Sequence, residues 1–322
     1  MKAATHATFG SPDVITVGEA PAPTPGADEV LVRVHASTVG VVDSLARRGS
    51  PAYARIHFGL RKPRFPVLGC DFAGTVAAVG SSVTRFAIGD QVFGTIAPRF
   101  GAHAQYVCLS EQAAIAAKPA NVSHAEAAAL VDATALCFLR DKAHLRQGQA
   151  IAINGASGSV GTAAVQLAKH LGAAVTGVCG SRGADLVRKL GADTVVDYTQ
   201  ADFARATQAY DVIFDVAGKS SFWHCRTALS DTGIYLTTAP SPAIFAQMAL
   251  TARIGGKRAA VAFTGLRDAA AKRADLLYTA ELIEASAVVP VIDAIYPLDR
   301  IADAHRHVDA GHKQGNVVVT MT

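Results

Sequence analysis

Residues 150–161 read Ala-Ile-Ala-Ile-Asn-Gly-Ala-Ser-Gly-Ser-Val-Gly and join an apolar, strand-like run to a glycine-rich turn that opens a helix-like stretch. A buried strand that leads into a helix in this way leaves the first helical amides unpaired, and such amides bind pyrophosphate. Gly155, Gly158 and Gly161 suit the tight turn, the close backbone approach and the close helix–strand contact that this geometry needs. Because their spacing is GxxGxxG and not GxGxxG, the turn taken alone fits a plain loop equally well.

Strand-like and helix-like segments alternate beyond the turn, and this context favours dinucleotide binding over a plain loop. The expected strands are 150–154, 174–179, 194–197, 211–216, 234–238 and one near 259–264, and the expected helices are 159–171, 183–190, 222–229 and one that runs to about residue 285. Such alternation predicts an α/β fold with a parallel, doubly wound sheet and helices on both of its faces.

The sequence on both sides of this region has a different pattern of hydrophobic and polar residues. Residues 1–121 are β-rich and alternate at period two, whereas Ser123 and Glu126 form a capping box ahead of a helical run at 127–139. A strand-like run at 288–295 follows the alternating region. We therefore expect a first domain segment at 1–121, a nucleotide-binding domain at 122–286 and a C-terminal return at 287–322.

The composition excludes several classes of protein. Of the 322 residues, 50% are hydrophobic and 17% are charged, which is typical of a globular protein and not of a disordered one. The formal net charge of +4 is scattered, too little for a nucleic-acid groove but favourable for an anionic cofactor. Five cysteines without a Cys-x-x-Cys pair argue against disulfides and structural zinc. We expect a cytoplasmic protein with neither nucleic acid nor a membrane as a partner.

The segment after the second expected strand indicates which dinucleotide binds. An NAD site places Asp or Glu there, whereas this chain has Gly180-Ser181-Arg182-Gly183. A guanidinium and a hydroxyl suit a 2′-phosphate, because Arg forms charge-assisted bonds to phosphate oxygens. Tyr198 follows the third strand and can close the same pocket. The alternatives are an arginine that is merely exposed and a tyrosine that merely packs; the pattern as a whole predicts NADP(H).

Several stretches carry a resemblance to a known family. They are residues 63–94 (PRFPVLGCDFAGTVAAVGSSVTRFAIGDQVFG), 154–173, 188–198, 210–222 and 312–320. Together they resemble the medium-chain dehydrogenase/reductase superfamily, and most closely its zinc-free quinone oxidoreductase branch, including the reticulon-4-interacting-protein-like members. The resemblance implies a GroES-like catalytic domain made from both chain ends, an inserted Rossmann domain, and a homodimer.

The same resemblance allows a test for zinc. Zinc-dependent relatives use a Cys three residues before an Asp, and then a Gly-His-Glu motif; here Gly40 precedes Asp43 and the second motif reads Gly69-Cys70-Asp71. Because a catalytic zinc needs three protein ligands plus water, we expect no metal site. For Asp43 we favour pairing with Arg47 on a short helix over catalysis.

The resemblance also implies which residues line the cofactor. Thr134, in the segment Asp132-Ala133-Thr134-Ala135, approaches the nicotinamide, although a Thr in an apolar helix can instead bond to its own backbone. Phe263 and Asn316 flank the nicotinamide from the end of a strand and from the C-terminal return. The remaining expected cofactor contacts come from the turn and from the loop after the fourth strand: Ala156, Ser157, Ser159, Val160, Val216 and Gly218.

Fewer residues can be assigned to contact with the substrate than to contact with the cofactor. Quinone reductases of this branch often carry Asn-Pro-x-Asp, but this chain has Gly40-Val41-Val42-Asp43 and so lacks the polar Asn. Tyr53, in a long loop at 49–66, either donates a proton, stacks on a flat substrate or is a surface aromatic. His305 and His307 lie on a late amphipathic helix, where we expect a solvated face.

Three functions fit these observations. The first is hydride transfer from NADPH to a quinone or an α,β-unsaturated carbonyl, which needs less Lewis-acid help than a simple ketone because its developing charge is delocalised. The second is an enoyl-thioester reductase, with Arg61, Lys62 and Arg64 near a phosphate. The third is a structural or regulatory protein that binds NADPH with little turnover.

Overall fold

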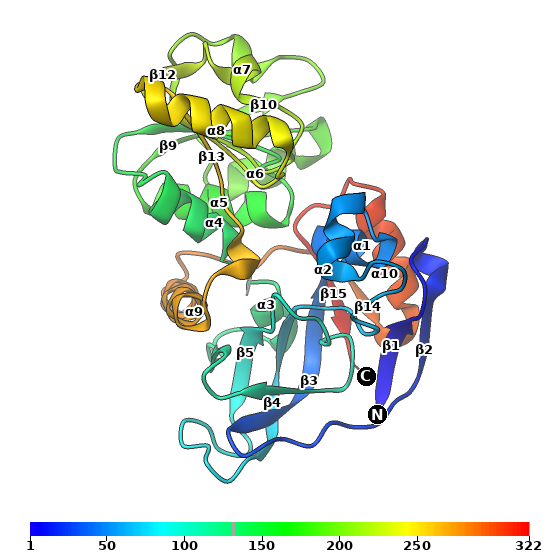
Figure 1. Cartoon of the computed structure of the whole chain (residues 1–322). Coiled ribbons are helices and arrows are strands. Elements are labelled where there is room, and N and C mark those ends of the chain that lie inside the picture. Colours follow the sequence, from blue (N-terminus) through cyan, green and yellow to red (C-terminus); the bar gives the residue numbers. More distant parts are fainter. Residues whose placement is uncertain (131–132, 322) are drawn as a thin grey trace. The chain divides into compact units, whose positions relative to one another are not determined.

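The computed structural model describes residues 1–130 and 133–321 (Figure 1). Its contacts divide the chain into two compact units, one made of Met1–Asp132 with Gly265–Thr322 and the other of Ala133–Thr264. We call these the first and the second unit and describe each by itself. The first unit is thus built from both ends of the chain, and the second is inserted between them.

A six-stranded parallel sheet forms the centre of the second unit. Its strands are β8 (Ala150–Asn154), β9 (Ala174–Cys179), β10 (Thr194–Asp197), β11 (Tyr210–Asp215), β12 (Leu229–Thr237) and β13 (Arg258–Val261). Their order is β10-β9-β8-β11-β12-β13, and every neighbouring pair is parallel. Counted along the chain this is the Rossmann order 3-2-1-4-5-6, which confirms the predicted α/β fold.

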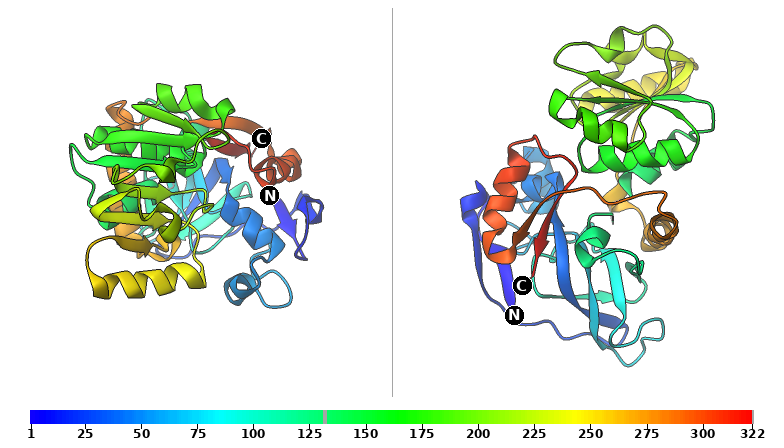
Figure 2. Two further views of the ribbon diagram at one scale, coloured as in Figure 1. Left: turned by 90° about the horizontal axis from the view of Figure 1, so that it is seen from above. Right: turned by 180° about the vertical axis from the view of Figure 1, so that it is seen from behind.

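Helices cover both faces of this sheet. They are α4 (Thr134–Leu136), α5 (Ser159–His170), α6 (Ala184–Lys189), α7 (Phe222–Cys225) and α8 (Pro242–Ile254). Helix α5 lies on one side of the sheet and α8 on the other (Figures 1 and 2). The sequence pattern did not predict a helix between the expected strands 234–238 and 259–264, although α8 lies there. Ser241 followed by Pro242 is its signal, because the Ser241 hydroxyl caps the helix by accepting from Ile244 N.

The first unit contains a mostly antiparallel sheet around one long strand. Its strands are β3 (Glu29–Val39), β4 (Asp71–Val79), β5 (Gln91–Thr95), β6 (Tyr106–Ser110), β7 (Ala114–Ala117), β14 (Ile292–Pro297) and β15 (Asn316–Thr320). Strands β1 (Lys2–His6) and β2 (Ile15–Glu19) pair with each other in a separate two-stranded sheet. Strand β3 pairs with β15, β4 and β6, and β14 runs parallel to β15. The C-terminal return therefore completes a sheet that the N-terminal residues begin.

The helices of the first unit explain where the chain passes from one unit to the other. They are α1 (Val41–Arg48), α2 (Arg55–Phe58), α3 (His124–Ala128), α9 (Ala269–Glu284) and α10 (Ile301–Asp309). Helix α3 packs on β3 and β4, and α9 packs on β7. The second unit consequently begins at Ala133 and ends at Thr264, whereas the sequence suggested boundaries after 121 and after 286.

The helical run expected at 127–139 is not one helix. Helix α3 ends at Ala128, α4 covers Thr134–Leu136, and a π-helix follows at Cys137–Lys142. Asp132, which belonged to the expected nicotinamide segment, lies outside the described residues. The capping box itself is present, because Ser123 Oγ accepts from Glu126 N and the Glu126 carboxylate accepts from Ser123 N at 2.8 Å.

A buried polar cluster lies in the first unit, contrary to the solvated helix face expected around His305. His305, on α10, is fully buried, as are His103 and Arg47. Among the described residues neither His305 nitrogen has a hydrogen-bond partner, although the His103 ring lies 6.0 Å away. Burial, reinforced by His103, Arg47 and His6, lowers the pKa of His305 to about 2. The period-3.6 pattern of α10 does not show that this histidine faces the core.

This cluster predicts acid lability. A histidine whose folded pKa is lowered binds fewer protons than it does in the unfolded chain, so its stabilising contribution is complete above about pH 6.5 and is lost as the pH falls. For His305 the expected loss is about 2 kcal/mol between pH 7 and pH 5. Urea unfolding of His305→Leu at several pH values between about 5 and 7 should show a pH slope flatter by about 1 kcal/mol per unit. The matched control is His312→Leu, at an exposed position, and an equal slope change there would contradict the assignment.

Candidate cofactor site

The glycine turn after β8 is held tightly against the sheet. The amides of Gly155 and Ala156 both donate to Val178 O, at 2.9 and 3.0 Å, and Gly155 adopts a φ of +89°. A Cβ atom on Gly161 would lie 2.0 Å from Gly155 O, so only glycine allows α5 to approach the turn this closely. Gly161 is thus the glycine that permits the close contact at the start of the helix, as the sequence spacing predicts.

The start of α5 provides amide groups that suit an anion. Gly158 is the N-cap, and the first helical bond runs from Thr162 N to Gly158 O at 2.8 Å. The amides of Val160 and Gly161 precede this bond and point out of the helix start. A Cβ on Gly158 would meet only Gly155 O, at 3.5 Å. The turn therefore fits the pyrophosphate of a dinucleotide, with Ala156, Ser157 and Ser159 completing it.

The loop after β9 lies beside the turn. Ser181, Arg182 and Gly183 form a short 3-10 helix, and a Cβ on Gly183 would lie 2.6 Å from the Cβ of Ser157. A Cβ on Gly180 would lie 3.5 Å from the Tyr198 hydroxyl. The structure thus brings together Ser157, Ser181, Arg182 and Tyr198, which come from the ends of three neighbouring strands.

This corner offers a cation and hydroxyl groups, which are groups that can bind phosphate. Ser181 and Arg182 are exposed, so the guanidinium is accessible to a ligand. Strand β9 ends in Cys179, and burial raises the pKa of its thiol, so it remains uncharged. The position where an NAD site carries an acidic residue is therefore occupied by neutral Cys179 and Gly180.

A buried carboxylate ties the strand ends together, and the sequence reading did not select it. Asp215, at the end of β11, is fully buried. One of its oxygens accepts from Asn154 Nδ2 at 2.8 Å, and the other accepts from Ser220 N and from the Tyr235 hydroxyl, both at 2.8 Å. Burial and the nearby Asp215 raise the pKa of Tyr235, so its hydroxyl remains a donor.

The same network positions the loop that follows β11. The amides of Val216 and Ala217 both donate to Asn154 O, at 3.0 and 3.1 Å. Asp215 therefore links the glycine turn, the loop after β11 and strand β12 in one set of hydrogen bonds. The available signal was that Asn154 ends the expected strand 150–154 and Asp215 lies one residue before the end of the expected strand 211–216, and the parallel sheet places these two residues side by side.

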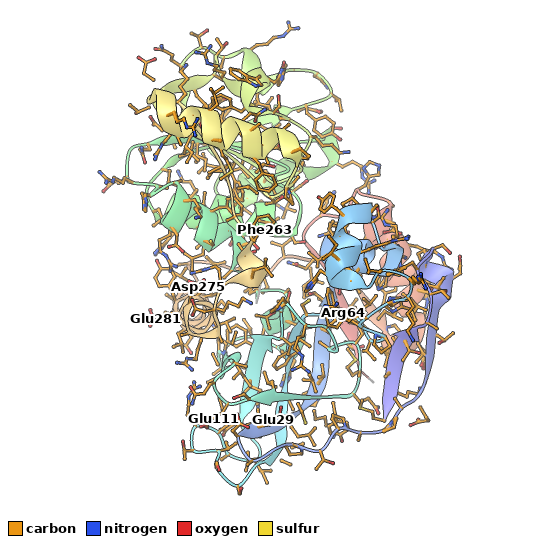
Figure 3. The ribbon with its side chains drawn as sticks, in the orientation of Figure 1. Glu29, Arg64, Glu111, Phe263, Asp275 and Glu281 are labelled. Carbon is orange, nitrogen blue, oxygen red and sulfur yellow. The ribbon has the colours of Figure 1, made fainter. Side chains whose placement is uncertain are left out.

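The residues expected near the nicotinamide lie in both units. Thr134 begins α4, and its hydroxyl lies 3.0 Å from the Thr264 hydroxyl. Phe263, labelled in Figure 3, follows β13. Its ring stacks on that of Phe245, with the centroids 6.2 Å apart. Gly218 has a φ of +62° in the loop after β11. With Val216, these residues belong to the second unit, which also carries the turn.

Tyr53 and Asn316 belong to the first unit, and their contact with the cofactor stays a prediction. Tyr53 is exposed and lies in a short 3-10 helix at Ala52–Ala54, within the segment that the sequence suggested to be a loop. Asn316 begins β15, and both its amide and its side-chain Nδ2 donate to Val291 O, at 2.8 and 3.2 Å. Asn316 is thus held by its own unit.

The expected pairing of Asp43 with Arg47 is wrong. Asp43 is buried at the third position of α1, where its oxygens accept from Gly40 N at 2.8 Å and from Gly69 N at 2.9 Å. Arg47 instead pairs with Asp309 on α10 at 2.5 Å. A carboxylate at this position caps its own helix, and here it also fixes the Gly69 segment. The expectation considered only residues four apart on one helix, whereas Gly69 and Asp309 lie far from these residues in the sequence.

The chain is similar to known proteins along nearly its whole length. A family model described as "Zinc-binding dehydrogenase" matches residues 190–319, and one described as "Alcohol dehydrogenase GroES-like domain" matches residues 26–120. The mitochondrial NAD(P)H oxidoreductase RTN4IP1 of Mus musculus is 30% identical over 325 residues, covering 91% of this chain and 82% of that protein. The chain belongs to the medium-chain dehydrogenase/reductase superfamily, in its quinone oxidoreductase-like group.

Two further comparisons agree with this membership. The chloroplastic NADPH-dependent alkenal/one oxidoreductase of Arabidopsis thaliana is 30% identical, covering 99% of this chain and 79% of that protein. The solved structure of the quinone oxidoreductase from Coxiella burnetii superposes with a TM-score of 0.87 at 27% identity, covering 100% of this chain and 99% of that one. The resemblance inferred from the sequence is confirmed, and the quinone oxidoreductase-like group is one of NAD(P)H-dependent oxidoreductases.

The donor groups of this superfamily member do not fit a catalytic zinc. Gly40 offers no side chain, and Cys70 Sγ donates to Arg99 O at 3.4 Å. Within residues 1–130 and 133–321, no three His, Cys, Asp or Glu side chains are arranged to hold a metal ion. Across the same described residues, no helix is long and apolar enough to cross a membrane.

Proposed function

We propose that this chain is an NADPH-dependent, zinc-independent oxidoreductase that transfers a hydride to a quinone or an α,β-unsaturated carbonyl. The observation that carries the proposal is the corner formed by Ser157, Ser181, Arg182 and Tyr198 beside the glycine turn. The guanidinium of Arg182 and the neighbouring hydroxyls suit the 2′-phosphate that distinguishes NADPH from NADH. The choice of acceptor follows from the missing zinc ligands.

In this proposal the protein binds the cofactor, orients it toward the acceptor and shields both from water, and NADPH when bound supplies the hydride. The amides at the start of α5 hold the pyrophosphate, and Ser181 with Arg182 holds the 2′-phosphate. Thr134, Val216, Gly218 and Phe263 of the second unit line the nicotinamide end.

The acceptor must delocalise its own developing charge. Gly40 and Cys70 stand where zinc-dependent relatives carry metal ligands, so these positions do not hold a metal ion that could polarise the acceptor. A quinone or an enone delocalises the charge through conjugation, so orientation and hydrogen bonds suffice. The proton that completes the reduction comes from water or from the exposed hydroxyl of Tyr53. The name of the Arabidopsis relative, an alkenal/one oxidoreductase, supports this class of acceptor.

Enoyl thioesters are the second candidate acceptors. Arg61, Lys62 and Arg64 are all exposed on one loop of the first unit, where they suit the phosphates of such a substrate. Steady-state NADPH oxidation across a panel of quinones, enones, alkenals and enoyl thioesters tests the proposal. Saturable turnover of a quinone, enone or alkenal supports it, and preference for enoyl thioesters favours the second candidate. Tight NADPH binding without oxidation of any acceptor indicates a structural or regulatory role.

The cofactor preference gives a separate prediction. Replacing Arg182 by Ala should raise the Kd for NADPH by roughly tenfold, equivalent to about 1.4 kcal/mol for a charge-assisted contact, and leave the Kd for NADH almost unchanged. Quenching of protein fluorescence during titration measures both constants. Arg188→Ala is the matched control, since Arg188 is an exposed cation on α6 that pairs with Asp185 at 2.9 Å. Equal weakening of both cofactors by Arg182→Ala would show that this residue does not read the 2′-phosphate.

A further inference from the structure

The first unit carries a segment in which positive charge and exposed apolar side chains occur together. From Ser44 to Cys70 the chain contains no Asp or Glu but six Lys and Arg residues. Three of these cations, Arg61, Lys62 and Arg64, are exposed and have no carboxylate within ion-pair distance among the described residues. We call residues 49–66 the basic loop.

The underside of the basic loop is fixed to its own unit by aromatic packing. The rings of His57, Phe58, Phe65 and Phe100 contact one another with centroids 5.2 to 6.0 Å apart. His57 Nε2 lies 3.1 Å from Pro98 O, and Arg64 N donates to Phe58 O at 2.7 Å. The loop therefore has a defined inner side, which its aromatic residues occupy.

The outer side of the basic loop presents aliphatic side chains to solvent. Ile56 is 74% exposed and Leu60 is 71% exposed, within a few residues of the three cations. Figure 2 shows the chain between α1 and β4 projecting from the rest of the first unit, and Figure 3 marks Arg64 on it. What distinguishes this loop is that its exposed aliphatic side chains lie within a few residues of cations without an ion-pair partner in the described part of the chain, a combination that suits a partner both apolar and anionic.

We propose that the basic loop docks the protein on the surface of an anionic lipid bilayer. Ile56 and Leu60 enter the boundary between headgroups and acyl chains, and Arg61, Lys62 and Arg64 contact the anionic headgroups. Two separate aliphatic side chains can insert into the fluid apolar part of a lipid bilayer. A stable protein–protein interface, in contrast, needs roughly 800 Å² of complementary surface on each partner. The attachment is peripheral, and it revises the expectation from the sequence that a membrane is not a partner.

Docking gives the proposed reaction a substrate source. A long-chain quinone or a lipid-derived enone dissolves in the bilayer and not in water, so an enzyme held at the surface meets it at high local concentration. This benefit rests on the proposed function, whereas docking itself does not require turnover. Binding can therefore be tested on the whole chain without any acceptor, and the failure of one proposal is distinguishable from the failure of the other.

Co-sedimentation with vesicles of phosphatidylcholine containing 30% phosphatidylglycerol, compared with pure phosphatidylcholine, tests the docking. We expect binding at least tenfold stronger with phosphatidylglycerol at 0.1 M NaCl, and its loss at 0.5 M NaCl, because headgroup attraction is screened by salt. The double variant Ile56→Ser with Leu60→Ser should weaken binding at least tenfold, and so should Arg61→Ser with Lys62→Ser. Each variant should keep the NADPH affinity and the thermal midpoint of the original chain.

The matched control is the double variant Ile88→Ser with Leu266→Ser. These positions are 67% and 65% exposed in the same unit but lie outside the basic loop, so their replacement should leave vesicle binding unchanged. Equal binding to both kinds of vesicle, or equal loss in the control, would overturn the proposal. It would also be overturned if size-exclusion chromatography showed that the Ile56 and Leu60 variant only dissociates a dimer, since the loop would then be a contact between copies.

Discussion

Replacing Gly161 by Ala is expected to destabilise the second unit by about 3 kcal/mol or more and to abolish measurable NADPH binding. The added Cβ would lie 2.0 Å from Gly155 O and 2.8 Å from backbone atoms of Ala156. Neither partner is a flexible side chain, so α5 must move away from the turn, at the cost typical of severe overpacking. Chemical unfolding and NADPH titration measure the two effects.

Gly158→Ala is the informative comparison for this prediction. Its Cβ would stand 3.5 Å from Gly155 O, an ordinary contact, and Gly158 has a φ of −79° that any residue adopts. We expect its unfolding free energy to stay within about 0.5 kcal/mol of the original. Its Kd for NADPH should nevertheless rise at least tenfold, because the methyl group occupies the approach of the pyrophosphate. Unchanged NADPH affinity in both variants would show that the turn does not bind the cofactor.

The second large effect is expected for Asp215→Asn. The carboxylate accepts hydrogen bonds from Asn154, Ser220 and Tyr235, and an amide in its place would turn an NH₂ group toward some of these donors. Burying unsatisfied donors in this way costs about 3 kcal/mol. NADPH affinity should fall as well, because the network positions both loops that approach the cofactor. Calorimetric unfolding with and without NADPH separates the two effects.

Asp211→Asn is the control on the same strand. Asp211 lies nearer the start of β11, is only partly buried, and accepts from Ala150 N at 2.9 Å and Ser230 Oγ at 3.0 Å. Its replacement should cost about 1 kcal/mol and leave NADPH affinity unchanged. If Asp215→Asn retained full cofactor affinity, Asp215 would be a residue of the core and not one that positions the site.

The elements of the second unit were predictable because their signals are local. Strand, turn and helix follow one another within 150–161, and alternation of such segments leaves few topologies. The order of the strands then brings together loops that are far apart in the sequence, including the corner of Ser157, Arg182 and Tyr198.

Features that depend on distant partners were not predictable in this way. His305 is buried by packing against His103, about 200 residues earlier in the chain, and Asp43 binds the amide of Gly69 instead of Arg47. The boundaries of the units along the chain depend on whether α3 and α9 pack against the sheet of the first unit or that of the second. Capping residues and periodicity do not contain that information, because either sheet offers an apolar face.

Transfer of deuterium from NADPH tests the proposed function most directly. The protein would be incubated with NADPH carrying two deuterium atoms at C4 of the nicotinamide and with an enone, and the product analysed by mass spectrometry and NMR. We expect one deuterium on the β-carbon of the saturated ketone, and much slower transfer from the corresponding NADH. Product without deuterium, or consumption of neither cofactor with any enone or quinone, would contradict the assignment of this chain as an NADPH-dependent reductase.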